Sequence, residues 1–310
     1  MADLIKLQSH VNRLRDQIND LRYRYHVLND PEVTDAMYEG LMNELRNIED
    51  EHLELVTPDS PTQRVAGKPL EKFDKIVHTV PQWSFNDAFD EDDMRDWEER
   101  ILKFLHKSLG TRPDDLDYVC ELKIDGLHMV LTYDNGMLKT AATRGDGKVG
   151  EDVTQNIRTI ETVPLRLKQG VSLVAEGEVW LSAVMLKKIN EERKKHDEPL
   201  FANPRNAAAG TIRQLDARIV AERKLSFTAY DISRIEDPRN KFQDPIDTQE
   251  KELLELKGLG FYTDSHWKVC KTIDEVIAFW KIWEKKKDSQ PFWIDGIVIK
   301  VNQKKYQDAL

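Results

Sequence analysis

The stretch from residue 118 to 143 constrains the fold most, because its pattern predicts antiparallel strands in direct succession. Apolar and polar residues alternate over Tyr118–Ile124 and Leu127–Tyr133, as expected for strands. Asp134-Asn-Gly136 is a strong hairpin turn, and it leads into a third strand at Met137–Thr143. Strands joined by so short a turn run antiparallel. We therefore expect antiparallel sheets.

Further strands and helices are predicted along the chain without regular alternation. The strands are expected at Val171–Leu181, Leu225–Ile232 and Ile294–Val301. The helices are expected at about 91–107, 182–196, 206–215, 247–257 and 273–287. Antiparallel hairpins mixed irregularly with helices indicate an α+β domain with flanking helices.

The first 50 or so residues predict a helical hairpin. Apolar residues recur there at steps of three and four, which is the spacing of one helix face. The two stripes are Leu4, Leu7, Val11, Leu14, Ile18, Leu21, Tyr25 and Leu28, and then Tyr38, Leu41, Leu45 and Ile48. Pro31 and Thr34 interrupt the helix between the stripes, and Asp35 is a plausible cap for the second helix. A small dimerising coiled coil explains this pattern equally well.

A loop-like segment follows the hairpin. Residues 56–82 contain four prolines and are expected to lack regular structure. We place the domain boundary near residue 68. The chain would then consist of a small helical domain, residues 1–68, and an α+β domain, residues 69–310.

Composition narrows the function classes. The chain has 46 Lys and Arg against 56 Asp and Glu, a net charge of −10, which is the wrong sign for a domain held on DNA by bulk electrostatics. It has no run of 18 apolar residues and no secretory signal at its start, so we expect a cytoplasmic protein without a membrane span. Cys120 and Cys270 are too few for a four-cysteine zinc site or a disulfide framework.

One glycine motif is expected to be a turn. Gly145-Asp-Gly147-Lys-Val-Gly150 satisfies the three-glycine pattern of dinucleotide-binding sites. That motif must follow a strand and open a helix inside a strand–helix–strand unit. Here a predicted hairpin precedes it, so we expect a turn with functional side chains.

The segment Cys120-Glu-Leu-Lys-Ile-Asp-Gly126 carries the candidate nucleophile. Alternate side chains share one face of a strand, so Glu121, Lys123 and Asp125 are expected together, and Gly126 would let a ligand approach closely. A lysine is nucleophilic only without its proton, which requires desolvation or nearby cations. A surface ion-pair ladder is the competing interpretation, and Lys-x-Asp-Gly occurs by chance in roughly one chain of this size in fifteen.

The chain resembles the N-terminal and adenylation regions of bacterial NAD-dependent DNA ligases over essentially its whole length. The resemblance rests on blocks in order: Asp59-Ser-Pro-Thr-Gln-Arg-Val65, Cys120–Gly126, Ala142-Thr-Arg-Gly-Asp-Gly147, Gly177-Glu-Val179, Phe201-Ala-Asn-Pro-Arg-Asn-Ala-Ala-Ala-Gly210, Arg213-Gln-Leu-Asp216 and Ile294-Asp-Gly-Ile-Val-Ile-Lys300. It implies a nucleotidyltransferase fold for residues 69–310 and roles in DNA replication and repair.

The resemblance implies that Lys123 attacks the AMP phosphorus of NAD and releases nicotinamide mononucleotide. The implied catalytic residues are Lys123, Asp125, Asp295 and Lys300. The implied nucleotide-binding residues are Ser84, Phe85, Glu121, Arg144, Glu178, Tyr230 and Lys300. The implied phosphate or DNA contacts are Arg205 and Arg213. Mg²⁺ would travel with the nucleotide, not in a protein cage. The ring of Tyr230 suits stacking on adenine, although a core tyrosine is the alternative. Residues 295 and 300 fall on opposite faces of a regular strand, so Asp295 is expected at its start.

The helical domain is where the family binds the nicotinamide half. The residues that match are Tyr25, His26, Asp35, Tyr38 and Glu39. Glu39 departs from the family's aspartate. Three other positions also depart from the family's usual residues, with His128 for a small residue, Phe85 for leucine and Glu176 for arginine.

The expected activity is limited to the first chemical step. In the family cycle, AMP passes from the lysine to a 5′-phosphate at a nick, and the 3′-hydroxyl then displaces it. The chain ends at Leu310 without the family's oligonucleotide-binding barrel, zinc module or helix-hairpin-helix region. We therefore expect a monomer that adenylates itself, binds nicked DNA weakly and seals nicks poorly. An ATP- or GTP-using nucleotidyltransferase and a non-catalytic nucleotide-binding or dimerisation module stay open as alternatives.

Overall fold

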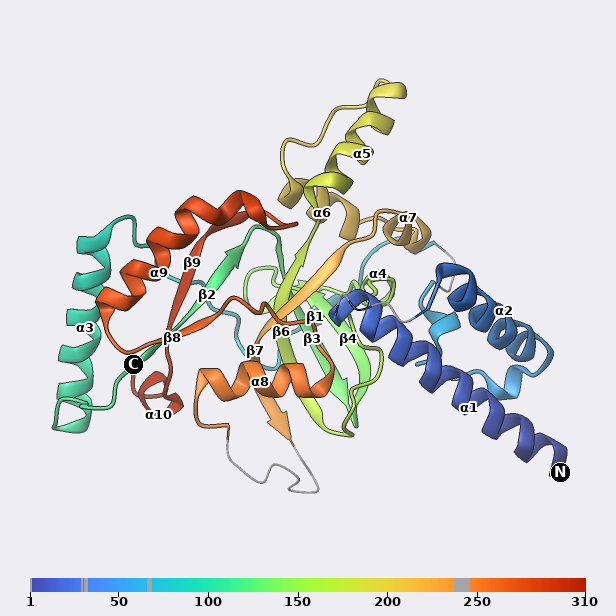
Figure 1. Ribbon diagram of the computed structural model, residues 1–310, viewed down its shortest axis with the longest axis horizontal. Helices are drawn as coiled ribbons and strands as arrows, with labels where there is room; N and C mark the ends of the chain where they lie inside the picture. Colours follow the sequence, from blue (N-terminus) through green and yellow to red (C-terminus); the bar gives the residue numbers. More distant parts are fainter. Residues whose placement is uncertain (1, 29, 31–32, 66–68, 237–245) are drawn as a thin grey trace.

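A helical domain at the N-terminus is followed by antiparallel sheets that helices cover (Figure 1). The computed structural model describes residues 2–28, 30, 33–65, 69–236 and 246–310. The helices are α1 (Ala2–Tyr23), α2 (Asp35–Glu51), α3 (Glu91–Leu109), α4 (Thr154–Ile157), α5 (Ala183–Lys195), α6 (Pro204–Ile212), α7 (Ala217–Glu222), α8 (Gln249–Leu259), α9 (Ile273–Lys286) and α10 (Lys304–Gln307). The strands are β1 (Lys75–Val77), β2 (Tyr118–Ile124), β3 (Leu127–Asp134), β4 (Met137–Thr143), β5 (Val149–Glu151), β6 (Ser172–Trp180), β7 (Ser226–Glu236), β8 (Lys268–Cys270) and β9 (Ile294–Val301).

The sheets confirm the α+β prediction. One sheet has the order β4-β3-β6-β7, a second has β8-β2-β9, and β1 pairs with β5, all antiparallel. The bounds of β2, β4 and β9 are those expected from the pattern. The short strands β1, β5 and β8 were not predicted, because three residues do not establish an alternation. The prediction of a loop over residues 56–82 is wrong where β1 forms.

The turn between β3 and β4 has the predicted geometry. Asn135 and Gly136 both have positive φ, at 48° and 80°. This combination belongs to the two-residue turns whose twist matches that of the flanking strands. A Cβ on Gly136 would also lie 2.7 Å from the carbonyl oxygen of Gln169, so glycine is required on both grounds.

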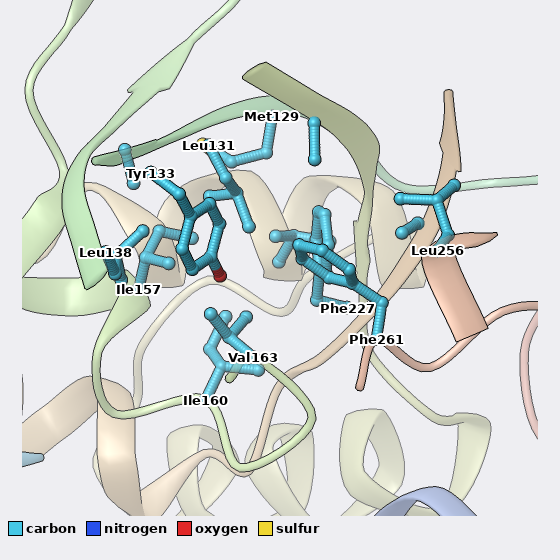
Figure 2. Packing of buried hydrophobic residues seen from close by; sticks show 14 of the residues in the cluster. Met129, Leu131, Tyr133, Leu138, Ile157, Ile160, Val163, Phe227, Leu256 and Phe261 are labelled. Carbon is cyan, nitrogen blue, oxygen red and sulfur yellow. The ribbon is translucent and has the colours of Figure 1, made fainter. Parts of the chain in front are cut away.

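Two cores lie on opposite sides of β2. The four-stranded sheet packs against α4, α6, α7 and α8 in a cluster that includes Met129, Leu131, Tyr133 and Phe261 (Figure 2). The three-stranded sheet packs Tyr118, Cys120 and Leu122 against α3 and α9. The other face of β2, which carries Val119, Glu121 and Lys123, therefore points toward the four-stranded sheet.

The N-terminal domain is the predicted helical hairpin. α1 and α2 pack through a small apolar core, and inside it Arg15 and Ser60 bind the buried Glu49 at 2.5 and 2.7 Å. α1 ends at Tyr23 and continues as a π-helical turn over Arg24–Leu28. The cap of α2 is Thr34, whose hydroxyl accepts a hydrogen bond from the amide of Met37 at 3.4 Å. Asp35 is instead the first helical residue, so its prediction as the cap was wrong. The predicted boundary near residue 68 lies outside the described residues.

Buried arginines attach the N-terminal domain to the loop after α4. Arg64 donates hydrogen bonds to the carbonyl oxygens of Arg158, Ile160 and Val163 at 3.1, 3.1 and 3.0 Å. Arg22 donates to the carbonyl oxygen of Glu161. Burial, followed by the charge of Arg64, lowers the pKa of Arg22 to about 9. The loop carbonyls thus obtain donors from the other domain.

Replacing Arg64 by alanine is expected to lower the free energy of unfolding by about 2–4 kcal/mol, because three carbonyl groups, two of them in buried hydrogen bonds, each lose a donor. Urea unfolding measures the change. Arg166→Ala is the matched control: Arg166 is exposed and pairs with Asp59 at 3.4 Å, so it should cost less than about 1 kcal/mol. Equal losses in the two variants would show that the carbonyls find water instead.

Candidate active site

A cavity of about 260 Å³ lies beside the inner face of β2, and Lys123 is in its wall. The lining residues come from the loop after β1, from β2, β3, β6, β7 and β9, from the turn after β4 and from α6. They are Trp83, Ser84, Phe85, Asp87, Glu121, Leu122, Lys123, Ile124, His128, Arg144, Glu178, Arg205, Tyr230, Val298 and Lys300. A larger cavity, about 660 Å³, is lined by residues such as Arg64, Asp152 and Arg158, and it contains none of the predicted site residues.

A bulge between β2 and β9 brings Asp295 to Lys123. Lys123 lies opposite Gly296 and Ile124 opposite Ile294, so Asp295 has no partner in the register. A bulge redirects the side chain of the extra residue, and the Asp295 carboxylate forms an ion pair with Lys123 Nζ. Lys300, opposite Val119, keeps the regular alternation and reaches the same side of the sheet. Residues 295 and 300 would lie on opposite faces of a regular strand, and this bulge explains how both reach the same side of the sheet.

Asp125 and Gly126 lie in the turn after β2, where strand alternation no longer applies. Asp125 is therefore not among the cavity-lining residues, although its carboxylate lies 3.5 Å from Arg205 Nη1. A Cβ on Gly126 would lie 2.3 Å from the carbonyl oxygen of Val179 and 2.8 Å from Glu178 Cγ. Glycine is thus required by the packing of this turn on β6, and the expectation that Gly126 lets a ligand approach closely stays a prediction.

A buried charge cluster closes one end of the cavity. Lys300 Nζ lies 3.1 Å from Glu121 Oε1, 3.2 Å from Asp231 Oδ2 and 3.0 Å from the carbonyl oxygen of Tyr230. Burial alone would lower the pKa of Lys300, but Glu121, Asp231 and Glu252 raise it above its ordinary value. The ammonium is therefore permanent and has several partners. Glu121 Oε1 is buried and has no hydrogen bond despite its ion pair.

Two arginines and Glu178 lie on the Lys123 side of the cavity. Arg144 Nη1 donates to the hydroxyl of Ser84 at 3.1 Å, and Arg205 contacts Asp125. Both guanidinium groups have partners that an anionic ligand could replace. Burial raises the pKa of Glu178 to about 8, and Arg205 and Lys123 oppose this shift. Near neutral pH this carboxyl is therefore largely protonated.

Glu178→Gln is expected to change how stability depends on pH. An unfolded glutamate with its ordinary pKa of 4.5 loses its proton before the folded Glu178 does. The free energy of unfolding of the wild type therefore falls as the pH rises from about 4.5 to about 8. The variant should become the more stable protein above pH 8, by about 1–2 kcal/mol, since partial exposure screens the charge. Urea unfolding at pH 6 and pH 9 tests this, with the exposed Glu191→Gln as control. Parallel wild-type and Glu178→Gln profiles would contradict it.

The predicted nicotinamide-binding residues are not part of this cavity. The rings of Tyr25 and His26 meet edge to face at 4.7 Å in the N-terminal domain. Burial, followed by Arg22, Arg64 and Lys224, lowers the pKa of His26, and burial with Glu161 raises that of Tyr38 to about 12. These residues thus lie near the domain contact. Glu39 is exposed, and the side chain of Asp35 lies outside the described part.

Arg213 also does not line the cavity, and it instead pairs with Glu151 of β5 at 3.1 Å. Conversely, Trp83, Asp87 and His128 line the cavity but were not predicted to do so. Their signal was weak, because Trp83 and Asp87 lie in the irregular segment between β1 and α3 and His128 stood out only as an unusual residue for the family.

The glycine motif after β4 is a turn, as predicted. Gly145 and Gly147 have φ values of 58° and 90°, and the strand β5 follows them, not a helix. Asp146 accepts backbone hydrogen bonds from Lys148 and Val149 at 2.9 and 2.8 Å, which stabilise the turn.

Among the described residues, no group of three or more His, Cys, Asp or Glu side chains could hold a metal ion. In the same part of the chain no helix has the length and apolarity needed to cross a membrane.

Comparison with known families decides what this arrangement is. Residues 70–310 match the family model of the NAD-dependent DNA ligase adenylation domain. The chain belongs to this family. Residues 5–66 match a second model, the DNA ligase-like, N-terminal NAD+-binding domain. The predicted family, its nucleotidyltransferase fold and its adenylation function are thereby confirmed.

Curated relatives extend well beyond this chain. A protein named DNA ligase from Thermotoga neapolitana is 44% identical over 301 residues, which are 97% of this chain and 42% of that protein. One of the same name from Halothermothrix orenii is 47% identical over 298 residues, or 96% and 42% of the two chains. One from Clostridioides difficile is 40% identical over 306 residues, or 99% and 44%. This chain thus spans less than half the length of these relatives.

Proposed function

We propose that Lys123 takes AMP from NAD and holds it as a phosphoramidate. The observation that carries the proposal is the cavity wall, where Lys123 Nζ shares one space with Arg144, Arg205 and the ring of Tyr230. Attack forms a nitrogen–phosphorus bond between Nζ and the AMP phosphorus. The bond from that phosphorus to the bridging oxygen breaks, and the oxygen leaves with nicotinamide mononucleotide.

The adenine would lie at the end of the cavity formed by Tyr230 and Glu121. A tyrosine ring offers a flat apolar face for stacking on a purine. Glu121 is buried and pairs with Lys300 through Oε1 at 3.1 Å, and a carboxylate has acceptor sites left for a second donor. The exocyclic amino group of adenine is a donor of the right kind. Lys300 would keep Glu121 in the ionised, accepting form.

The phosphates would lie between Lys123 and the two arginines. Arg144 and Arg205 would exchange Ser84 and Asp125 for phosphate oxygens and stabilise the charge that develops during transfer. Asp295 would orient Nζ through the observed ion pair, and the attacking amine must leave that pair as it loses its proton. Mg²⁺ bound to the nucleotide stays a prediction.

The N-terminal domain would set the choice of donor. We assign the nicotinamide half to Tyr25, His26, Asp35, Tyr38 and Glu39, and the match of residues 5–66 to an NAD+-binding domain model supports this. These residues do not line the cavity that contains Lys123, so one NAD molecule would have to extend from that cavity to the N-terminal domain.

Ligation of DNA is proposed for the longer protein of this type, since the curated relatives are named DNA ligase. AMP would pass from Lys123 to a 5′-phosphate at a nick. Arg205 and Arg213 would contact phosphate groups after giving up Asp125 and Glu151. With a net charge of −10, this chain should bind nicked DNA weakly and seal it poorly. A monomeric state and a cytoplasmic location stay predictions.

Incubation with NAD or with ATP, followed by mass measurement of the intact chain, tests the donor. We expect one adenylate adduct from NAD, with release of nicotinamide mononucleotide, and none from ATP. An adduct from ATP alone would support an ATP-using nucleotidyltransferase instead. No adduct from NAD, ATP or GTP would support a non-catalytic nucleotide-binding module.

A further inference from the structure

His128 links separate walls of the cavity through hydrogen bonds. It lies on β3, and its Nδ1 is 2.6 Å from the hydroxyl oxygen of Tyr230 on β7. Its Nε2 is 2.9 Å from Gln82 Oε1, at the start of the loop that carries Trp83, Ser84 and Phe85 into the cavity. The imidazole itself also lines the cavity, next to the ring proposed to stack on adenine.

Gln82 determines the direction of these hydrogen bonds. Its amide nitrogen donates to the carbonyl oxygen of Val80 at 2.9 Å, so its oxygen is the atom that faces His128. An acceptor at this position requires a hydrogen on His128 Nε2. Burial, followed by the charges of Arg144 and His78, lowers the pKa of His128 to about 4, so the ring is neutral near pH 7. A neutral imidazole carries one hydrogen, and Nδ1 must therefore accept.

Tyr230 must be the donor in its hydrogen bond to His128. Burial, followed by nearby carboxylates including Glu178 and Glu176, raises its pKa well above the ordinary value, so the hydroxyl keeps its hydrogen and donates it to His128. The two hydrogen bonds thus connect Tyr230 to His128 and His128 to Gln82. The backbone N–H of Gln82 in turn donates to the carbonyl oxygen of Gly147 at 2.9 Å. A rotation of the Tyr230 ring or a shift of the loop would break a hydrogen bond.

We propose that His128 is a positioning residue for the adenine half of the nucleotide. It fixes the Tyr230 ring and the loop that begins at Gln82 as two walls of one pocket. This inference rests on the proposed function. His128 contacts Tyr230 and Gln82 and makes no hydrogen bond or ion pair with Lys123 or Asp295, so it acts on binding of the nucleotide and not on attack at phosphorus. Its loss should raise the NAD concentration needed for half-maximal rate and leave the maximal rate of adduct formation nearly unchanged.

Single-turnover adduct formation, measured over a range of NAD concentrations, separates these two quantities. Tyr230→Phe removes only the hydroxyl, and His128→Phe removes both ring nitrogens with little change in size. Tyr230→Phe should raise the half-saturating NAD concentration roughly three- to tenfold, as expected for one lost neutral hydrogen bond. His128→Phe also loses the hydrogen bond to Gln82, so it should raise this concentration at least as much. The double variant should be no worse than His128→Phe, because both changes break the same hydrogen bond. His128→Asn, which restores an acceptor near the Nδ1 position, should bind NAD better than His128→Phe.

Tyr133→Phe is the matched control. Its hydroxyl donates to the carbonyl oxygen of Pro164 at 2.7 Å in the core, so the variant should lose stability without a change in half-saturating NAD. An unchanged half-saturating concentration in Tyr230→Phe, or strictly additive effects in the double variant, would overturn the inference. If His128→Phe does not fold, Tyr230→Phe still decides. A wild-type chain that never forms an adduct from NAD would overturn the proposed function, whereas an active wild type with unaffected variants overturns only the role of His128.

Discussion

Lys123→Ala is expected to abolish the adenylate adduct, lowering its rate of formation by more than about a thousandfold. The phosphoramidate needs an amine nitrogen in the cavity that can lose its proton. Lys300 is the other lysine among the described cavity-lining residues, and its ammonium is held by Glu121, Asp231 and a backbone carbonyl. Lys300 therefore cannot replace Lys123 as the nucleophile.

Lys123→Arg should fail as completely as Lys123→Ala, because a guanidinium group stays protonated and its nitrogens are poor nucleophiles. Lys139→Ala, an exposed lysine on β4 that pairs with Asp134 at 3.9 Å, should retain wild-type activity. Intact-mass measurement after incubation with NAD reports all three variants. Covalent AMP on Lys123→Ala would refute the assignment of the nucleophile.

Lys300→Met is expected to have the largest effect on stability, about 3–5 kcal/mol, and also to abolish adduct formation. The side chains of Lys300 and Glu121 are each only 8% exposed, and Asp231 shares the same ammonium. Removing the cation leaves two carboxylates near each other without a counter-charge. Urea unfolding measures the loss, and intact mass measures the activity.

The double variant Lys300→Met with Glu121→Gln separates the two effects. It removes the charge of the more deeply buried partner, so it should recover part of the lost stability. It should not recover the adduct, since the acceptor proposed for adenine is changed as well. A Lys300→Met variant as stable as wild type would show that Glu121 and Asp231 do not depend on this ion pair.

Local sequence predicted the longer elements well. The alternation in residues 118–124 and 137–143, with the Asn135-Gly136 turn before the second stretch, defined β2 and β4 to the residue. The helical hairpin was also predicted from local sequence, because its apolar stripes extend over many helical turns. Three-residue strands such as β1 were missed because they form only where a neighbouring strand offers hydrogen bonds.

The candidate site was predicted in part. Glu121, Lys123 and Asp125 were expected on one strand face, but only Glu121 and Lys123 of these three line the cavity. Lys300, predicted from the resemblance, lines it as well. The placement of Asp295 depends on a bulge between two strands 170 or so residues apart, which no local pattern reports. His128 attracted notice as an unusual residue, but its role required knowing that Tyr230 and Gln82 lie next to it.

The sequence by itself determined the longer elements and the family, because strand alternation, turn geometry and the ordered motifs are properties of neighbouring residues. Only the tertiary structure decided which side chains meet. It brought Asp295 to Lys123, joined Tyr230 to Gln82 through His128, and left Tyr25 and His26 at the domain contact. The physical reason is that registers, bulges and domain contacts depend on surfaces that are complete only after distant segments have packed together.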